Sequence, residues 1–413
     1  MNSSDSETPM DFRKTSCCIV GGGPGGVFLA LLLARKGVDV TLLELHDDFD
    51  RDFRGDTIHP STLEALNQIG LAEGLLRLPH GKLNSLQLHS GGTTTTLATF
   101  SRLRIPFPYI MILPQSHFLE YLIKEAEKYP TFHRIMGANV QRLVQKEGVI
   151  NGVLYRSQDG VWHQVTAGLT IGADGRFSKV RTLADLEPIR SHPPMDVLWF
   201  RLPKKANDFH DQLRFYVEGG LFSFAIDRGA EWQVGFVLLK GSFAELKSAG
   251  LDTLRGKLGK VIPWLADRTD ALGDWKQVAV LSVESSIVKK WHKPGLLLIG
   301  DSAHVMSPVG GVGISYAIQD AIEAANVLSE PLKKGSVTEM DLAEIQKRRE
   351  PSVKAIQKFQ GFIQDRVIQL ALKPNQPFQL PWFARLLLSV PILRNIPAKM
   401  IAYGTNPARI QNP

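Results

Sequence analysis

The chain has 413 residues, of which 44% are hydrophobic and 22% charged, with a formal net charge of +7. This length and apolar content allow a large core and predict two domains. The basic residues are scattered and match no RRM, zinc-finger or helix-turn-helix pattern, which argues against a nucleic-acid partner. The mild positive charge favours anionic ligands such as phosphorylated cofactors.

The cysteine content and the first residues bear on the cellular compartment. Cys17 and Cys18 are adjacent in a predicted strand, so they point to opposite faces and predict neither a disulfide nor a metal site. Without a disulfide framework we expect a reducing compartment, and therefore a cytoplasmic protein. Residues 1–16 are polar and acidic, which predicts a frayed tail rather than a signal peptide. The sequence has no uncharged apolar run of transmembrane length.

Residues 17–37, CCIVGGGPGGVFLALLLARKG, predict a short buried strand, a glycine-rich turn and an apolar helix. The turn has the GxGxxG pattern and consists of Gly21, Gly22, Gly23, Pro24, Gly25 and Gly26. In this pattern the first glycine allows a tight turn, the second admits a pyrophosphate, and the third lets the helix pack on the strand. The helix N-terminus then favours the phosphates. The turn alone leaves NAD, NADP and FAD as alternatives.

A second parallel strand is predicted at residues 39–44, DVTLLE, which ends in Glu44. A carboxylate about twenty positions beyond the glycines binds a ribose in such folds. It also disfavours a 2′-phosphate, which argues against NADP at this site. The alternative is a solvated glutamate at the end of a strand, and the spacing favours the ribose contact.

The next segments predict helices and then a meander. One helix is expected to begin at Pro60 and Ser61, with Leu63, Leu66 and Ile69 on its apolar face. Another is expected within residues 111–129, with Ser116 as N-cap and an apolar face of Phe118, Leu119, Leu122 and Ile123. Residues 139–171 predict three strands joined by two turns. A plain dehydrogenase domain would continue with further βα units instead.

Residues 189–285 predict a mostly antiparallel sheet with a helical insert at 242–268, between the last two strands. This layer is a candidate substrate domain. Its strands alternate, for example Leu213, Phe215 and Val217 against Arg214, Tyr216 and Glu218, and one row should face the cofactor. Four aromatic residues either line a cavity or fill an ordinary core, and these are Phe222, Phe224, Trp232 and Phe236. A buried strand near 296, a long helix over 310–335 and C-terminal helices are expected to follow.

Two further motifs end predicted strands: Asp174-Gly175 in IGADGRFSKVR and Gly300-Asp301 in LLLIGDSAHVMSPVGGVG. Each alone is a weak turn signal. Taken in order, GxGxxG with Glu44, GADG and GD-x-AH-x-x-x-P-x-x-G-x-G resemble the group A FAD-dependent aromatic hydroxylases, the para-hydroxybenzoate hydroxylase family. The resemblance covers residues 16–330 and is weakest in the middle of the chain and in the C-terminal helices.

The resemblance implies an α/β (α+β) fold in which an antiparallel-sheet substrate domain is inserted into a Rossmann-like, GxGxxG-type FAD-binding domain. The FAD-binding domain would comprise residues 14–78, 106–188 and 286–336. The substrate-binding domain would comprise residues 79–105 and 189–285. A C-terminal helical segment would take up residues 337–413.

The resemblance also assigns cofactor contacts residue by residue. The ADP half of FAD would lie on the Gly21 to Gly26 turn and Glu44. Arg54 would lie near the cofactor and Gln115 would contact its ribityl side. Asp174 would contact flavin and pyridine nucleotide, and Asp301 of the Gly300-Asp301 motif would bind the ribityl chain. The isoalloxazine ring would lie beside Pro308, Gly311, Val312 and Gly313. The family commonly has Gln and Asn where this chain has Val312 and Ser315, so backbone contacts to the ring would remain and side-chain contacts would not. We assign no catalytic residue, and His304 is expected to be a packed, hydrogen-bonded histidine.

The implied activity is that of a monooxygenase which uses NAD(P)H and O₂ to hydroxylate an aromatic or other apolar small molecule through a flavin hydroperoxide. The main alternative is a reductase or dehydrogenase of the prenyl-reductase type on the same fold. A halogenase is disfavoured because the WxWxIP signature is missing, and the DG and GD motifs argue against a non-catalytic flavin-binding protein. The sequence leaves the substrate, the choice between NADH and NADPH, and the choice between monomer and homodimer open.

Residues 380–404 gather apolar side chains, with Arg385, Arg394 and Lys399 among them. The charges and three prolines exclude a membrane-spanning helix. The favoured interpretation is helices docked on the FAD-binding domain or at a dimer contact. The other is an apolar rim that touches an anionic membrane and gives access to a lipophilic substrate.

Overall fold

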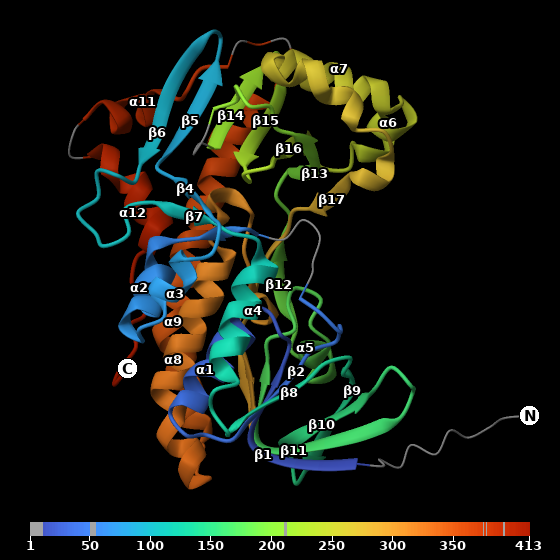
Figure 1. Cartoon of the computed structure of the whole chain (residues 1–413), viewed down its shortest axis with the longest axis vertical. Coiled ribbons are helices and arrows are strands. Elements are labelled where there is room, and N and C mark those ends of the chain that lie inside the picture. Colours follow the sequence, from blue (N-terminus) through green and yellow to red (C-terminus); the bar gives the residue numbers. More distant parts are fainter. Residues whose placement is uncertain (1–10, 50–54, 210–212, 375, 377, 391–392) are drawn as a thin grey trace, which may run out of the picture.

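Two large sheets lie one above the other along the long axis of the molecule, and long helices run beside them (Figure 1). We call them the lower sheet and the upper sheet, after their places in Figure 1. This computed structural model describes residues 11–49, 55–209, 213–374, 376, 378–390 and 393–413. The mixture of helices and sheets confirms the predicted α/β class.

The lower sheet has eight strands, of which β20, β11, β1, β2 and β8 form a parallel centre. Its strands are β1 (Asp11–Val20), β2 (Val40–Leu43), β8 (Phe132–Ile135), β9 (Asn139–Lys146), β10 (Val149–Arg156), β11 (Trp162–Gly172), β19 (His292–Lys293) and β20 (Leu296–Leu298). The predicted three-stranded meander is confirmed as β9, β10 and β11. The predicted tail is wrong from residue 11 onward, because Asp11 already pairs with His163 on the long strand β11.

Helices cover the lower sheet, and α1 is buried along almost its whole length between the sheet, α4 and α8. The helices that share one hydrophobic core with this sheet are α1 (Pro24–Arg35), α2 (Pro60–Gln68), α3 (Ala72–Leu76), α4 (Gln115–Ala126), α5 (Lys179–Leu183), α8 (Gly313–Lys334) and α9 (Glu339–Ile363). Burial on all sides explains why α1 is apolar all round. The predicted apolar faces of α2 and α4 are confirmed as buried. The prediction of Ser116 as N-cap is wrong, because Ser116 lies inside α4. The helix begins at Gln115, and Pro114 is at the cap position.

The upper sheet has seven strands in the order β17-β13-β16-β15-β14-β5-β6. Their bounds are β5 (Ser85–Ser90), β6 (Thr93–Thr99), β13 (Met195–Pro203), β14 (Leu213–Glu218), β15 (Leu221–Asp227), β16 (Glu231–Leu239) and β17 (Ala279–Ser282). All neighbours are antiparallel except β14 and β5. The predicted helical insert is α6 (Phe243–Ser248), α7 (Leu251–Val261) and a 3₁₀ helix (Pro263–Ala271), and it packs on one face of this sheet.

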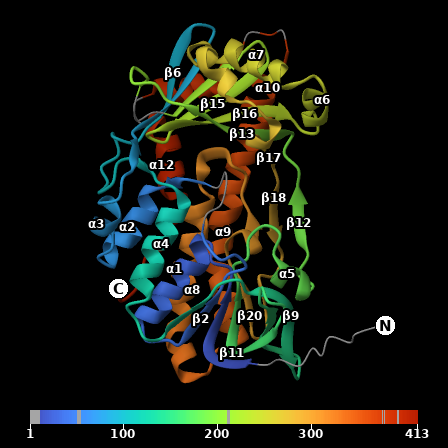
Figure 2. The same ribbon diagram turned by 45° about the vertical axis from the view of Figure 1, so that its right-hand side comes forward.

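Short strands connect the two large sheets. The last of the strands predicted within residues 189–285 is broken after β17, where the Val283 amide donates to the Asp196 carboxylate at 3.2 Å. The chain then continues as β18, which pairs with β12 and β21 and runs with β12 between the two halves (Figure 2). The remaining strands are β3 (Thr57–Ile58), β4 (Gly81–Leu83), β7 (Ile110–Ile112), β12 (Pro188–Ser191), β18 (Ser285–Val288) and β21 (His304–Val305).

The C-terminal region is helical, as predicted. After α9 come a π-helical stretch (Gln364–Ile368), α10 (Gln369–Ala371), α11 (Trp382–Ser389), a 3₁₀ turn (Leu393–Asn395) and α12 (Ile396–Tyr403). The described side chains of α11 include none that is buried, whereas α12 buries Ala398 and Ala402 fully. Within the ranges described above, no helix has both the length and the apolarity that crossing a bilayer requires.

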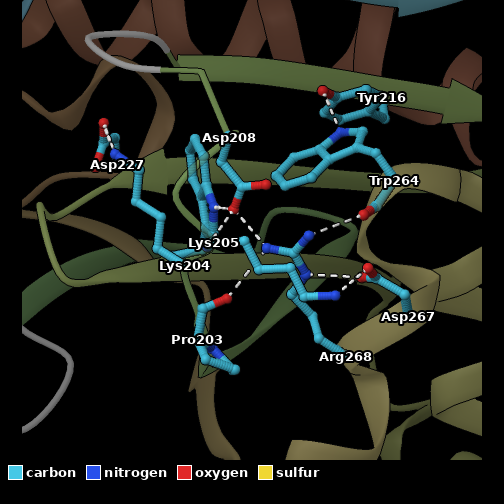
Figure 3. Close-up of polar contacts among 10 residues, drawn as sticks. Pro203, Lys204, Lys205, Asp208, Tyr216, Asp227, Trp264, Asp267 and Arg268 are labelled. Atoms are coloured by element: carbon cyan, nitrogen blue, oxygen red, sulfur yellow. Dashed lines mark hydrogen bonds and ion pairs between the residues drawn. The ribbon is translucent and has the colours of Figure 1, made fainter.

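A buried ion pair fastens the helical insert to the upper sheet. Arg268 of the 3₁₀ helix contacts Asp208, and their side chains are 6% and 8% exposed. The same carboxylate accepts hydrogen bonds from the Trp232 indole at 2.8 Å and from the Lys205 amide at 2.9 Å. Figure 3 shows this cluster, in which Trp264 lies beside the ion pair. Burial raises the pKa of Asp208, but the hydrogen bonds from its partners outweigh burial and hold the pKa at about 2.

We expect Asp208→Ala to lower the free energy of unfolding by about 3–5 kcal/mol, because the guanidinium of Arg268 would stay buried with its main partner removed. Since the folded-state pKa of Asp208 is depressed from 3.8 to about 2, its stabilisation should be complete above about pH 4 and be lost as the pH falls toward 2. Urea unfolding at several pH values measures both effects. The control is Asp252→Ala, which removes an exposed pair with Arg255, and equal losses in the two variants would contradict the prediction.

Candidate cofactor and active site

The predicted cofactor motifs meet at one edge of the lower sheet. Strands β20, β11, β1 and β2 are parallel neighbours, so their carboxyl ends lie side by side (Figure 1). Gly300-Asp301 follows β20, Asp174 follows β11, Gly21 follows β1 and Glu44 follows β2. Ligands of open α/β sheets bind at this edge. The structure therefore brings together four motifs that are far apart in the sequence.

The glycine-rich turn leaves no room for side chains on its inner side. A Cβ on Gly21, where φ is +111°, would lie 2.4 Å from the Ala173 carbonyl oxygen, and one on Gly26 would lie 2.0 Å from the Gly21 oxygen. Gly23 is different, because no described atom outside its own chain neighbours lies within 4 Å of its Cβ position. Helix α1 begins at Pro24, and none of the described side chains caps its N-terminus. The turn thus presents open backbone and free N–H groups, as phosphate binding requires.

Glu44 is 6% exposed and braces the glycine turn from behind. One carboxylate oxygen accepts a hydrogen bond from the Gly22 amide at 2.7 Å, and the other accepts one from the His46 amide at 3.0 Å. The alternative of a solvated glutamate is therefore wrong. These bonds fix the carboxylate beside the turn, and its contact with a ribose stays a prediction.

Asp174 of the DG motif ties two loops together. One of its oxygens accepts from the Ser178 hydroxyl at 2.5 Å and from the Ser302 hydroxyl at 3.1 Å, and the other accepts from the Val180 amide at 2.9 Å. The Ser302 hydroxyl in turn accepts from the Gly175 amide at 3.0 Å. The DG loop and the GD loop are thereby joined. The predicted contact of Asp174 with flavin or pyridine nucleotide stays a prediction.

A fully buried carboxylate on α8, that of Asp320, holds the GD loop in place. It accepts hydrogen bonds from the Gly300 amide at 3.0 Å, from His304 Nε2 at 2.6 Å and from Arg349 Nε at 2.8 Å. Burial raises the pKa of Asp320, but His304 and Arg349 outweigh burial and keep the pKa below its usual value. His304 is therefore a packed, hydrogen-bonded histidine, as expected. Asp301, the predicted ribityl contact, directly follows the anchored Gly300.

The turn before α8 offers backbone rather than side chains. Gly310 and Gly311 have φ of +82° and +64°, and beyond the local backbone no described atom lies within 4 Å of a Cβ on Gly313, where the helix begins. The side chain of Val312 is buried. Ser315 is also buried, and its hydroxyl accepts from Thr62 on α2 at 3.3 Å. The two departures from the family pattern thus point into the protein and leave the backbone free.

Gln115 begins α4, and its backbone N–H donates to a carboxylate oxygen of Asp56 at 3.4 Å. Asp56 forms an ion pair at 3.0 Å with Arg228, in the turn between β15 and β16 of the upper sheet. Both side chains of this pair are largely buried. The segment next to Gln115 is therefore attached to the upper sheet. Arg54, the other predicted residue of this segment, lies outside the described residues.

The apolar, aromatic face of the upper sheet packs mainly against the end of α9, the π-helical stretch and α10, and it shares that cluster with Val309 of the Pro308–Gly313 turn. Phe215 and Val217 of β14 pack in one cluster with Val309 of that turn. Tyr216 faces the other way and accepts a hydrogen bond from Trp264 of the insert at 2.8 Å. The row that includes Phe215 is thus the one that faces the cofactor motifs. Among the four aromatic candidates, Phe222 and Phe224 lie on this side, whereas Trp232 and Phe236 fill the core beneath the insert.

Sequence reasoning missed Asp320 and Arg349. Asp320 had a readable signal, because it is a carboxylate among the apolar positions Ile318, Ala321 and Ile322 of a predicted helix. Arg349 had none, since it lies in the charged run EIQKRRE, where one arginine resembles the next. The ion pair between Asp56 and Arg228 was missed because its partners lie in two loops that are far apart in the sequence.

Residues 14–360 match the FAD binding domain family, and the chain belongs to this family of FAD-dependent aromatic hydroxylases and monooxygenases. It is 33% identical over 408 residues to a 6-methylpretetramide 4-monooxygenase of Streptomyces rimosus, which covers 98% of this chain and 96% of that protein. It is 24% identical over 348 residues to a para-nitrophenol 4-monooxygenase of Pseudomonas sp. (strain WBC-3), covering 80% and 82% of the two chains.

Solved structures share the fold. The p-nitrophenol 4-monooxygenase PnpA of Pseudomonas putida DLL-E4 superposes with a TM-score of 0.77 and 18% identity, over 96% of this chain and 100% of that one. The OxyS anhydrotetracycline hydroxylase of Streptomyces rimosus has a TM-score of 0.73 and 21% identity, over 94% and 76% of the two chains. Family and relatives together make this chain a flavoprotein oxidoreductase, a FAD-dependent monooxygenase, and favour oxygen chemistry over the reductase alternative.

The residues present fit FAD. The open positions at Gly23 and Gly313 lie at the uncapped N-termini of α1 and α8, where backbone N–H groups favour a pyrophosphate and an electron-rich ring edge. Next to the second of these turns, the ring nitrogen Nε2 of His59 is buried and has no hydrogen-bond partner among the described residues. Open backbone and an unpaired polar atom are features that a bound ring system would complete.

We expect Asp320→Asn to lower the free energy of unfolding by about 3–5 kcal/mol, because the charge of Arg349 would be buried and uncompensated. FAD affinity should fall as well, since the Gly300 loop would lose its anchor. Urea unfolding and FAD titration of the apoprotein measure the two effects. The control is Glu323→Gln, which breaks a more exposed pair between the same helices, Glu323 with Arg348 at 3.2 Å, and should cost less than about 1 kcal/mol. An Asp320 variant as stable as the control would contradict this assignment.

Proposed function

We propose that this monooxygenase uses NAD(P)H and O₂ to hydroxylate an aromatic small molecule that binds between the Pro308–Gly313 turn and the upper sheet. One observation carries the proposal: Phe215 and Val217 of β14 share a hydrophobic cluster with Val309, which lies in the turn where the flavin ring is predicted. Two of its aromatic neighbours, Phe222 and Phe224, have ring centroids 6.1 and 5.7 Å from that of Phe215. An apolar aromatic surface of this kind suits a flat aromatic substrate.

In this proposal the residues of the chain bind and orient the cofactor through backbone groups. Gly23 and the N-terminus of α1 bind the phosphates, Glu44 the ribose, and Asp301 the ribityl hydroxyls. FAD supplies the transfer of electrons from NAD(P)H to O₂. The N-terminus of α8 stabilises negative charge on the adjacent ring edge. The apolar face of the upper sheet keeps water away from the reacting atoms.

The names of the relatives supply the test compounds: 6-methylpretetramide, anhydrotetracycline and p-nitrophenol. With a true substrate we expect NADH or NADPH oxidation to rise by about tenfold or more, which corresponds to about 1.4 kcal/mol of activation free energy. One oxygen atom of ¹⁸O₂ should appear in the product. Label that enters the product only from H₂¹⁸O would contradict monooxygenation. Each compound is tested with both nicotinamide cofactors, because the donor is part of the proposal.

Two neighbouring residues of β14 provide matched variants for the same assay. Phe215→Ala should raise the KM of the aromatic substrate about tenfold and leave FAD affinity unchanged. Tyr216→Phe changes the opposite face and should leave the KM unchanged.

We infer a cytoplasmic location, in agreement with the reducing compartment expected from the sequence.

We also infer separate roles for the two C-terminal helices. Helix α12 is docked on the protein, as the favoured interpretation expected, whereas α11 keeps the features of a membrane-contacting helix. Trp382 and Leu386 of α11 are 71% and 54% exposed, and Arg385 lies between them in the sequence. Membrane contact would bring a lipophilic substrate close to the upper sheet.

Flotation with anionic lipid vesicles tests the inferred membrane contact of α11. At low salt, where electrostatic attraction is strongest, we expect the protein to float with the vesicles and Trp382→Ser to float less. A wild-type protein that stays in the soluble fraction at low salt would exclude membrane contact. Neutral vesicles are the control for the contribution of the basic residues.

A further inference from the structure

The C-terminal helix α12 lies between the upper sheet and the part of the protein built on the lower sheet, which we call the cofactor half. It lies beyond residues 14–360, which match the family. Figure 1 shows it next to α2 and β7. Ala398 and Ala402 are fully buried in a cluster that contains residues from β4 and β5, the segment after β6, and β7, namely Leu83, Leu86, Phe100, Ile110 and Ile112. Helix α12 therefore packs against the upper sheet and the connecting strands β4 and β7, and it also contacts α2.

The chain after α12 is held on helices of the cofactor half. The anchoring hydrogen bonds are Ile410 amide to Gln68 Oε1 at 3.0 Å, Asn326 Nδ2 to the Arg409 carbonyl at 2.8 Å, Gln411 amide to Asn326 Oδ1 at 2.9 Å, and Lys36 Nζ to the Gln411 carbonyl at 2.8 Å. Gln68 ends α2, Asn326 is on α8 and Lys36 follows α1. These bonds keep α12 in place from its C-terminal side.

Helix α12 reaches the cofactor motifs through His59, which precedes α2 and is fully buried. The Nδ1 atom of His59 lies 2.8 Å from the Ile401 carbonyl oxygen. A carbonyl only accepts, so Nδ1 carries the hydrogen in this bond. Burial lowers the pKa of His59 to about 4, so the ring is neutral at pH 7 and Nε2 has no proton. The neutral tautomer is thus set by the C-terminal helix.

The other side of the His59 ring faces the Pro308–Gly313 turn. A Cβ on Gly311 would lie 3.6 Å from His59 Nε2, and one on Gly310 would lie 3.7 Å from Cγ1 of Ile401. Thr57, two residues before His59, donates to the Gly311 carbonyl at 3.1 Å. The turn is therefore surrounded by Thr57, His59 and Ile401. Two successive glycines at positive φ make the most flexible kind of backbone, and a site built on it needs such support.

We propose that His59 and α12 together hold the glycine turn in the conformation that receives the flavin ring, and that His59 is a positioning residue for this turn. The proposal rests on the proposed placement of the ring beside residues 311–313. Without the contact between His59 and Ile401, the turn would sample more conformations before the cofactor binds. FAD binding would then have to order the turn as well, which weakens affinity.

The test compares His59→Leu, which removes the bond to Ile401, with His59→Asn, whose amide keeps a donor near the position of Nδ1. Hydrogen exchange in the apoprotein follows the Gly311 amide, which donates to the Pro308 carbonyl at 3.0 Å. FAD affinity is measured by titration. We expect His59→Leu to speed exchange at Gly311 and to weaken FAD binding about tenfold, and His59→Asn to stay near the wild type.

The matched control is Tyr121→Phe, which removes another side-chain hydrogen bond to a carbonyl, that of Leu71 at 2.8 Å, on the same half of the protein. Exchange and FAD affinity of His59→Leu equal to those of the control would overturn the proposal. If His59→Leu does not fold, His59→Gln replaces it, because its amide lies near Nε2 and not near Nδ1. A wild type that binds FAD but hydroxylates no test compound would contradict the proposed function and leave this result unaffected.

Discussion

The arrangement of the cofactor half depends on the hydrogen bonds that the buried carboxylate of Asp320 accepts. A charge with no solvent exposure is tolerated only when donors surround it, and here three segments supply them: the Gly300 loop, His304 and helix α9 through Arg349. None of these segments can shift without leaving a buried charge unpaired. The carboxyl end of β20, the start of α8 and the middle of α9 are thereby fixed relative to one another, and with them the residue that would meet the ribityl chain.

Hydrogen bonds from backbone amides to carboxylates recur along the edge of the lower sheet. Glu44 accepts from the Gly22 amide, Asp174 from the Val180 amide and Asp320 from the Gly300 amide, so a carboxylate fixes the backbone at three of the four predicted cofactor motifs. The glycines then present bare backbone on the open side. Rigid loops made of flexible residues are a sensible solution for binding a large cofactor, because the backbone can approach closely and little order has to be gained on binding.

The upper sheet has two faces with separate tasks. One face is closed by the helical insert and its buried pair of Asp208 and Arg268. The other presents Phe215 and its aromatic neighbours to the turn before α8. The ion pair of Asp56 with Arg228 attaches the tip of this sheet to the segment beside the cofactor. Contacts between the halves would thus link the proposed substrate and flavin positions, which is what hydroxylation at a defined carbon requires.

The sequence by itself determined the elements whose constraints are local. The glycine turn was readable because Gly21 and Gly26 have no space for a Cβ, and the helices and strands because their apolar periodicity follows burial. Only the tertiary structure decided which face of β14 meets the cofactor motifs, because alternation predicts two faces and not what covers each. It also decided the pairing of His59 with Ile401, 342 residues apart, since a buried hydrogen bond between distant segments leaves no pattern in the chain.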